Sequence, residues 1–215
     1  MIRVKLLGLM VSVSSLAFTG TASADFLGFE IEAIESGLQD GGVDIGTTYR
    51  IYALVDAGGE VDAVYGDIDN PLSIQSTTSF YQNQFGGYGT PDAGLFGFFP
   101  PLEYDSFVTI GLLDDDGDAM LDIGIVWDDF EDNGGAIYTE NGTWFATPDE
   151  PQVQEIGGRV LIAQLTTDGE LSGTLSLQGK NEDLSNWNAV GVELPAPGAL
   201  ALLGLAGLVS RRRRK

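Results

Sequence analysis

Short stretches of alternating apolar and polar residues run through the centre of the chain, from Phe26 to Val192. Clusters of Gly, Asp, Asn and Pro separate them, and no long stretch has the 3.6-residue apolar period of a helix. Thr48–Val55 is typical, because its β-branched and aromatic residues suit a pleated, half-buried surface. The pattern predicts ten strands: Gly28–Ile34, Thr48–Val55, Ala63–Tyr65, Ser73–Phe80, Ser106–Leu113, Leu121–Val126, Thr143–Ala146, Val160–Thr166, Leu171–Gln178 and Trp187–Val192.

Ten short strands with frequent turn signals predict an all-β fold, an antiparallel two-sheet β-sandwich of the jelly-roll kind, in preference to a barrel. Val160–Thr166 and Leu171–Gln178 are expected to form a hairpin, because Asp168-Gly169 between them readily supplies a positive-φ turn. The irregular stretch Gln82–Pro101 is expected to be a packed surface loop. Since no repeat or linker precedes residue 194, a single central domain is expected.

The first 24 residues have the pattern of an export signal. A positive start is followed by the apolar stretch Leu6–Phe18, and Ala22 and Ala24 form a small-residue cleavage site before Asp25. As a helix the apolar stretch is roughly 20 Å long, short of the ~30 Å hydrocarbon core, so a permanent anchor is the weaker alternative. We expect signal peptidase to remove residues 1–24.

The last 22 residues combine a structure-breaking motif, an apolar stretch and a basic end. Pro195, Ala196 and Pro197 disfavour regular structure, since proline lacks a backbone donor. The apolar stretch Ala199–Val209 is short for a full span, and the positive-inside rule places the basic residues after it in the cytoplasm. These basic residues are Arg211, Arg212, Arg213, Arg214 and Lys215. The order predicts a transient membrane anchor preceded by a protease-accessible peptide.

This tripartite tail resembles the PEP-CTERM sorting signal, in which a Pro-Glu-Pro-like motif precedes a small-residue-rich transmembrane helix and an arginine cluster. Pro195-Ala196-Pro197 differs from that motif at its middle residue. The resemblance implies tail removal by an exosortase-like membrane protease and delivery to the cell surface or extracellular matrix of a Gram-negative-type bacterium. A plain C-terminal membrane anchor is the alternative.

The chain is therefore divided into a signal peptide at residues 1–24, an acidic β-sandwich at 25–193 and a sorting tail at 194–215. Only Arg50, Arg159 and Lys180 are basic in the central part, which holds all 32 acidic residues of the chain and has a formal charge of −29. Phosphate backbones and anionic lipids repel such a body. We expect no nucleic-acid partner, and membrane contact through the terminal segments only.

The composition also restricts catalysis. The chain has no cysteine and no histidine, so it has no Ser-His-Asp or Cys-His arrangement and no histidine-ligated or thiolate-ligated metal. A glycoside hydrolase needs two carboxylates at a set separation, and nothing in the pattern singles out one pair among 32 acids. We therefore predict no catalytic residue and no enzymatic activity.

The segment Leu113–Asp122 has five carboxylates within nine positions, the oxygen ligands that calcium prefers. A standard EF-hand loop is excluded, because Ala119 and Ile123 stand where glycine and a bidentate carboxylate are required. A looser calcium site is the hypothesis, and a solvated acidic turn is the alternative; the proposed ligands are Asp114, Asp116, Asp118 and Asp122. A second acidic cluster that the fold could bring to the first consists of Asp128, Asp129, Glu131 and Asp132.

Aromatic rings offer an apolar face to the C–H face of a sugar, so a stacking platform is a further hypothesis, with core packing as its alternative. Its candidates are Trp127, Trp144, Trp187, Tyr81 and Tyr88. The leading expectation is a non-enzymatic structural or adhesive surface protein associated with exopolysaccharide. A carbohydrate-binding module is the first alternative, and a carboxylate-based glycoside hydrolase is the second.

Overall fold

The computed structural model describes residues 26–195. The predicted signal peptide with Ala22 and Ala24, and the tail residues from Ala196 onward with Pro197 and the arginines Arg211–Arg214, lie outside the described residues. Within residues 26–195 no helix is long and apolar enough to cross a membrane.

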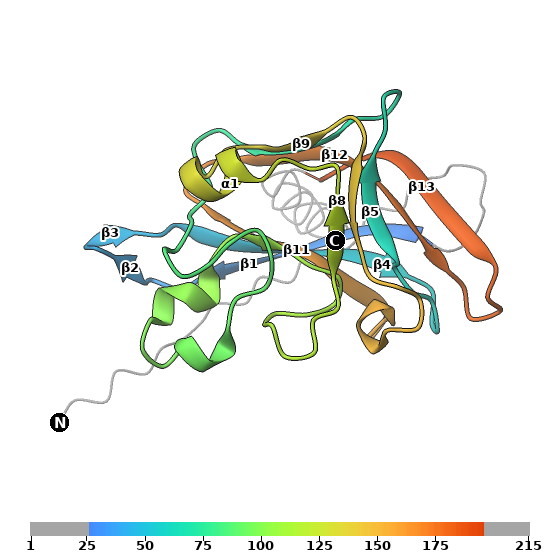
Figure 1. The fold of residues 1–215 in the computed structure, drawn as a ribbon, viewed down its shortest axis with the longest axis horizontal. Helices are drawn as coiled ribbons and strands as arrows, with labels where there is room; N and C mark the ends of the chain where they lie inside the picture. The colour runs from blue at the N-terminus through green and yellow to red at the C-terminus, as the bar shows by residue number, and fades with distance from the viewer. Residues whose placement is uncertain (1–25, 196–215) are drawn as a thin grey trace, which may run out of the picture.

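Two antiparallel sheets account for most of the fold (Figure 1). The four-stranded sheet has the order β1 (Phe26–Glu35), β4 (Thr47–Val55), β11 (Arg159–Thr167) and β7 (Phe107–Val108). The seven-stranded sheet has the order β8 (Leu121–Ile123), β10 (Gly142–Phe145), β5 (Ala63–Gly66), β12 (Leu171–Lys180), β6 (Leu72–Ser76) and β9 (Ile137–Thr139), with β13 (Asn186–Glu193) also paired to β12.

The remaining elements are short. A two-stranded ribbon is formed by β2 (Gln39–Asp40) and β3 (Val43–Asp44), and α1 (Asp128–Asn133) is the single α-helix among the described residues. Three 3-10 helices are η1 (Ala93–Leu95), η2 (Pro100–Tyr104) and η3 (Pro151–Val153). Gln82–Pro101 contains no strand, so the expected surface loop is confirmed.

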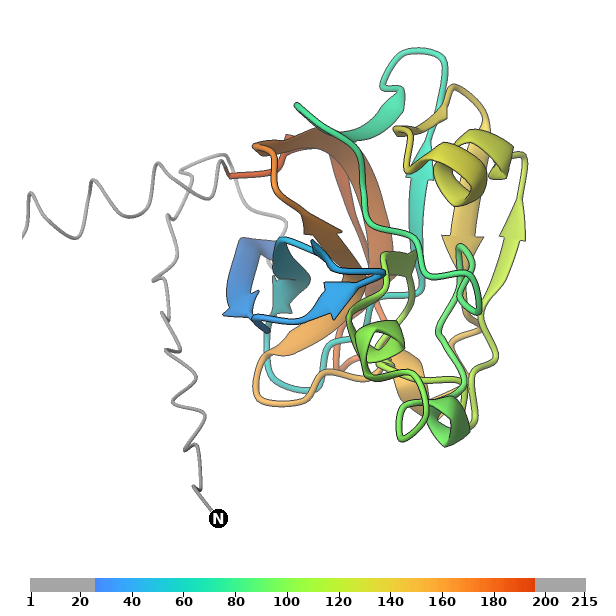
Figure 2. The same ribbon diagram turned by 90° about the vertical axis from the view of Figure 1, so that its left-hand side faces the viewer.

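One hydrophobic core joins the two sheets, which Figure 2 shows from the side. In β4 the alternating residues Ile51, Ala53 and Val55 are buried, as period-2 side-chain alternation requires for a strand with one face in the core. From the other sheet, Leu175 and Leu177 of β12 belong to the same buried cluster. The structure therefore confirms an all-β fold built of antiparallel sheets.

The predicted hairpin is wrong. Strand β11 pairs with β4 and β7, whereas β12 pairs with β5, β6 and β13, so residues 168–170 cross from one sheet to the other. The crossing is held by hydroxyl groups: Thr167 Oγ1 lies 2.7 Å from Ser76 Oγ and 3.0 Å from Thr78 Oγ1. Gly169 lies against these hydroxyls, where a Cβ would come within 2.4 Å of Ser76 Oγ. A glycine is needed here because of this close approach and not because of a hairpin turn.

Candidate functional site

The acidic segment after Leu113 is held by hydrogen bonds from neighbouring side chains. Asp122 accepts from Trp127 Nε1 at 3.0 Å and from the Tyr88 hydroxyl at 2.8 Å. Asp118 accepts from the Thr90 hydroxyl, from Gln152 Nε2 at 3.1 Å and from the Met120 N–H at 2.8 Å. Both carboxylates therefore fasten the loop around Tyr88 and Thr90 to the body.

The other two proposed calcium ligands lie in the turn before Asp118. Asp114 Oδ1 accepts from the backbone N–H of Asp116 at 3.2 Å, and the carboxylate of Asp116 is exposed. Among residues 26–195, no group of three or more acidic side chains is arranged to hold a metal ion. Calcium binding by these residues stays a prediction.

The two acidic clusters meet at a groove of about 490 Å³. Asp115 and Asp118 of the first cluster and Glu131 of the second line this groove, together with the glycine-rich segment 85–92. Glu131 Oε1 accepts from the Tyr88 N–H at 3.0 Å, so helix α1 also holds this segment. The remaining acids of the second cluster, Asp128, Asp129 and Asp132, do not line the groove.

The three tryptophans are buried, with exposed fractions of 7% for Trp127, 0% for Trp144 and 3% for Trp187. The ring of Trp127 is covered by Tyr88, which stacks on it at 4.6 Å between centroids. Tyr81 is half-buried and donates to Asp40 Oδ2 at 2.8 Å. The tryptophans therefore pack in the core, as the alternative interpretation held, and none of them presents an open ring face for stacking on a sugar.

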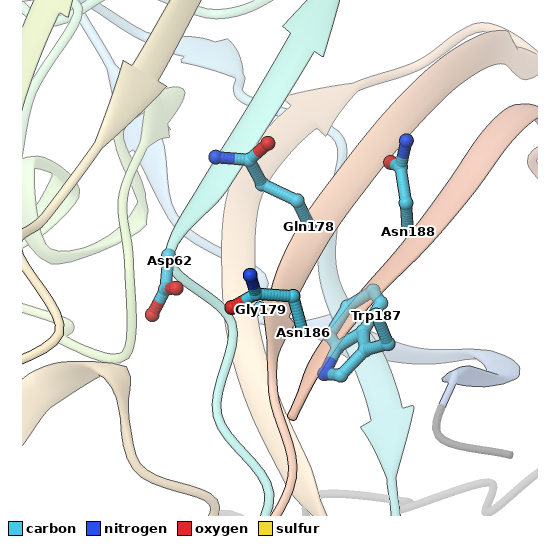
Figure 3. A pocket seen from close by; sticks show the side chains of 6 residues that line it. All are labelled: Asp62, Gln178, Gly179, Asn186, Trp187 and Asn188. Atoms are coloured by element: carbon cyan, nitrogen blue, oxygen red, sulfur yellow. The ribbon is translucent and has the colours of Figure 1, made fainter. Parts of the chain in front are cut away.

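A second hollow, of about 500 Å³, lies where β12 and β13 pass the segment before β5 (Figure 3). We call it the amide pocket; it is lined by Asp62, Gln178, Gly179, Asn186, Trp187 and Asn188. Gln178 pairs directly with Asn188 across β12 and β13, so their side chains share one face of the sheet. Asn186 lies two residues before Asn188 and faces the same way. In Figure 3 the side chains of Gln178 and Asn188 point upward from their strands, whereas the carboxylate of Asp62 points downward.

Backbone pairing brings Asp62 next to β12, opposite Gly179. The N–H groups of Glu60 and Asp62 donate at 2.9 Å to the carbonyls of Lys180 and Gln178, so the segment 60–62 continues the edge of β5 along β12. Asn186, another residue of the pocket lining, pairs with Lys180. The pocket is thus assembled from Asp62 and from residues 178–188, which lie 116 or more positions later in the chain.

Asp62 has an unusual electrostatic environment. Its Oδ1 is buried and has no hydrogen-bond donor within the described part of the chain. The pKa of Asp62 is raised to about 6, chiefly by burial and also by the nearby Glu60 carboxylate, while Lys180 opposes the rise. Glu60 is itself buried, with Oε1 3.7 Å from Lys180 Nζ and Oε2 accepting from Gln154 Nε2.

The floor of the amide pocket depends on a glycine. A Cβ on Gly179 would lie 1.9 Å from the Glu60 carbonyl oxygen and 2.7 Å from the Trp187 ring. The Trp187 ring stacks on Phe26 at 6.1 Å between centroids, and its Nε1 donates to the Lys180 carbonyl at 3.2 Å. Since both neighbours are fixed, residue 179 has no room for a side chain.

The three cations of the described chain are all engaged inside the fold. Arg50 Nε donates to Gln164 Oε1 at 2.9 Å, and Arg159 pairs with Glu30 and lies over the Tyr52 ring at 4.0 Å. Lys180 pairs with Glu60. Two of the three cations among residues 26–195 are thus paired with carboxylates, and the surface keeps its excess of negative charge.

A buried carboxylate also lies under the loop between β6 and β7. Asp105 is 0% exposed; its Oδ1 accepts from the Asn83 N–H at 2.7 Å, and its Oδ2 has no hydrogen-bond partner among residues 26–195. Burial raises the pKa of Asp105 to about 7 against the opposing effect of backbone hydrogen bonds. Because this carboxylate is closed off from solvent, we assign it a structural role.

Comparison with models of protein families, with curated proteins and with solved structures finds no match for this chain.

Proposed function

We propose that this protein is an exported surface or matrix component of a Gram-negative-type bacterium. Signal peptidase removes residues 1–24, and an exosortase-like protease processes the tail after the body has been exported. The body, a jelly-roll-like sandwich, acts as a non-enzymatic structural or adhesive component and associates with exopolysaccharide.

The observation that supports sorting most directly is the place where the folded body ends. Strand β13 ends at Glu193, and Leu194 is 7% exposed and donates its N–H to the Gly173 carbonyl at 2.8 Å. Pro195, the first residue of the predicted motif, follows at once. A protease that acts in this motif would cut next to the last anchored residue and leave the body intact.

A dedicated carbohydrate-binding module is the second candidate, and the amide pocket favours it. Amide and carboxylate side chains on a sheet face are suited to hydrogen bonding with sugar hydroxyls. A glycoside hydrolase has less support, because Asp62 is the single carboxylate among the residues that line this pocket, and that mechanism needs two.

Fractionation of the native organism tests the proposal. We expect the wild-type protein to be recovered with extracted exopolysaccharide, and a Pro195→Ala/Pro197→Ala variant to stay in the membrane fraction because its tail is not processed. Pro91→Ala, in a loop far from the tail in sequence, serves as the control and should behave as wild type. Recovery of the wild-type protein in the cytoplasm, or equal distribution of all three proteins, would contradict the proposal.

A further inference from the structure

We infer that the amide pocket binds a neutral, hydroxyl-rich sugar unit, and that it is the point at which the body contacts polysaccharide. The inference rests on the proposed association with exopolysaccharide and specifies both the residues and the chemistry of the sugar.

The hydrogen-bonding groups of the pocket are unused within the described chain. The side-chain amides of Gln178 and Asn186 make no hydrogen bond with residues 26–195, and each offers one acceptor and two donors. Asn188 uses its Oδ1 to accept from the Tyr65 hydroxyl at 2.7 Å, which leaves its NH₂ donors available. Asp62 Oδ1 is buried without a donor. A ligand hydroxyl in the pocket would therefore meet the other carboxylate oxygen of Asp62.

Donors and acceptors together favour a sugar hydroxyl over an ion. Each hydroxyl group donates once and accepts up to twice, so it complements a ring of amides beside a carboxylate. A metal ion would be bound by the amide oxygens and by a single carboxylate, and the amide N–H groups would be left without an acceptor. The three amide side chains are therefore better matched to a hydroxyl-bearing ligand.

Charge decides between neutral and acidic sugars. Asp62 lines the pocket and Glu60 lies beside it, while Lys180, the nearest cation, is already paired with Glu60. A uronate or sulfate group would meet these carboxylates without a free cation to neutralise it. The pocket therefore selects neutral sugars and rejects polyuronates.

The size and position of the pocket agree with binding to part of a long chain. Its volume of about 500 Å³ lies in the ~300–1,000 Å³ range of small-ligand sites. Gln178, Asn186 and Asn188 are exposed, so the pocket opens on the surface of the sheet. These three amides are therefore accessible to a sugar unit within a polymer.

The experiment measures binding of the full-length chain by equilibrium dialysis. The probes are neutral hexamers of glucose, galactose and mannose, with hexamers of galacturonate and mannuronate as the acidic set. Variants are Gln178→Ala, Asn186→Ala and the double variant. The control is Gln75→Ala, an exposed glutamine of β6 in the same sheet that does not line the pocket.

We expect at least one neutral hexamer to bind and both uronate hexamers to fail. Loss of one neutral hydrogen bond weakens binding about tenfold, so each single variant should lose about that factor and the double variant more. Gln75→Ala should bind as wild type does. The inference is overturned if no neutral hexamer binds, if uronates bind equally well, or if the double variant keeps its affinity.

Fractionation of the native organism with the same variants separates this inference from the proposed function. If the protein is recovered with exopolysaccharide in its native organism but the double variant is recovered equally, the pocket is not the contact and the inference fails alone. If the pocket variants abolish hexamer binding while the native protein stays in the cytoplasm, the proposed function fails and the site remains.

Discussion

The hydroxyl of Tyr88 donates to Asp122 at 2.8 Å, and the same carboxylate accepts from Trp127, on whose ring Tyr88 stacks. Asp122 thus pairs with both partners of one aromatic stack. The hydrogen bond to Asp122 also raises the pKa of Tyr88 to about 12, since it stabilises the neutral phenol. This arrangement gives Asp122 a structural role that its place in an acidic run did not predict.

Replacing Asp122 by alanine should destabilise the fold. Asp122→Ala leaves the Trp127 N–H and the Tyr88 hydroxyl without their acceptor, and an unsatisfied partly buried donor costs about 1–3 kcal/mol. We expect the free energy of unfolding in urea to fall by about 2 kcal/mol. The control Asp116→Ala removes an exposed carboxylate and should change stability by less than about 0.5 kcal/mol. Equal stability of the two variants would show that the two hydrogen bonds to Asp122 do not stabilise the fold.

A methyl group at residue 179 should disrupt the floor of the amide pocket. Gly179→Ala places a Cβ 1.9 Å from the Glu60 carbonyl, so the backbone of the segment 60–62 must move. Overpacking of this kind costs about 1–3 kcal/mol. The control Gly97→Ala has no atom within 4 Å of its Cβ and should be neutral in the same urea titration. If Gly179→Ala unfolds at the same urea concentration as the wild type, residue 179 is not closely packed against the Glu60 carbonyl.

Asp105 should give stability a specific pH dependence. Its pKa is raised from 3.8 to about 7 in the fold, so the folded state holds a proton that the unfolded chain has lost. The contribution of Asp105 to the free energy of unfolding is fully present below pH 4. It is lost as the pH rises through 7, by up to about 4 kcal/mol. This loss should be absent in Asp105→Asn. The unfolding free energy of the variant should therefore rise relative to that of the wild type between pH 4 and pH 8. Parallel pH curves for the two proteins would contradict this.

Calcium binding is tested by melting. If Asp114, Asp116, Asp118 and Asp122 bind calcium, metal at 100 times its dissociation constant stabilises the folded state by about 2.7 kcal/mol. We expect a higher melting temperature in millimolar calcium, and a smaller rise for Asp114→Asn/Asp116→Asn. This double variant is chosen because it leaves the hydrogen bonds of Asp118 and Asp122 in place. An unchanged melting curve of the wild-type protein would show that the folded chain does not bind calcium at these residues.

Alternation of apolar residues was enough to locate the longer strands, because each of the ten predicted segments contains a strand. The predicted strand lengths were wrong where side-chain hydrogen bonds interrupt the strand. The predicted strand Ser73–Phe80, for example, ends at Ser76, where side-chain hydroxyls bond to Thr167 and the chain turns. The ribbon strands β2 and β3 and strand β9 have two or three residues, too few to show a period; β7 and β8 are equally short and were located only because they lie within longer apolar stretches. Helix α1 has six residues and was missed for the same reason.

The amide pocket was not predictable from sequence. Asp62, Gln178, Asn186 and Asn188 form no local motif, and they meet only because β12 pairs with β13 on one edge and with the segment 60–62 on the other. The predicted hairpin would have placed β11 in the position that these neighbours occupy. A raised pKa for Asp62 was equally invisible, since its cause is burial in the assembled fold.

Export of the protein and its sorting to the surface are tested most directly by intact-mass spectrometry. The sample is the protein recovered from the native cell envelope and medium. The account predicts a mature chain that begins at Asp25 and ends within or just after Pro195-Ala196-Pro197, with any attached glycan seen as added mass. Recovery of the unprocessed 22.8 kDa chain, with Met1 and Lys215 both present, would contradict it.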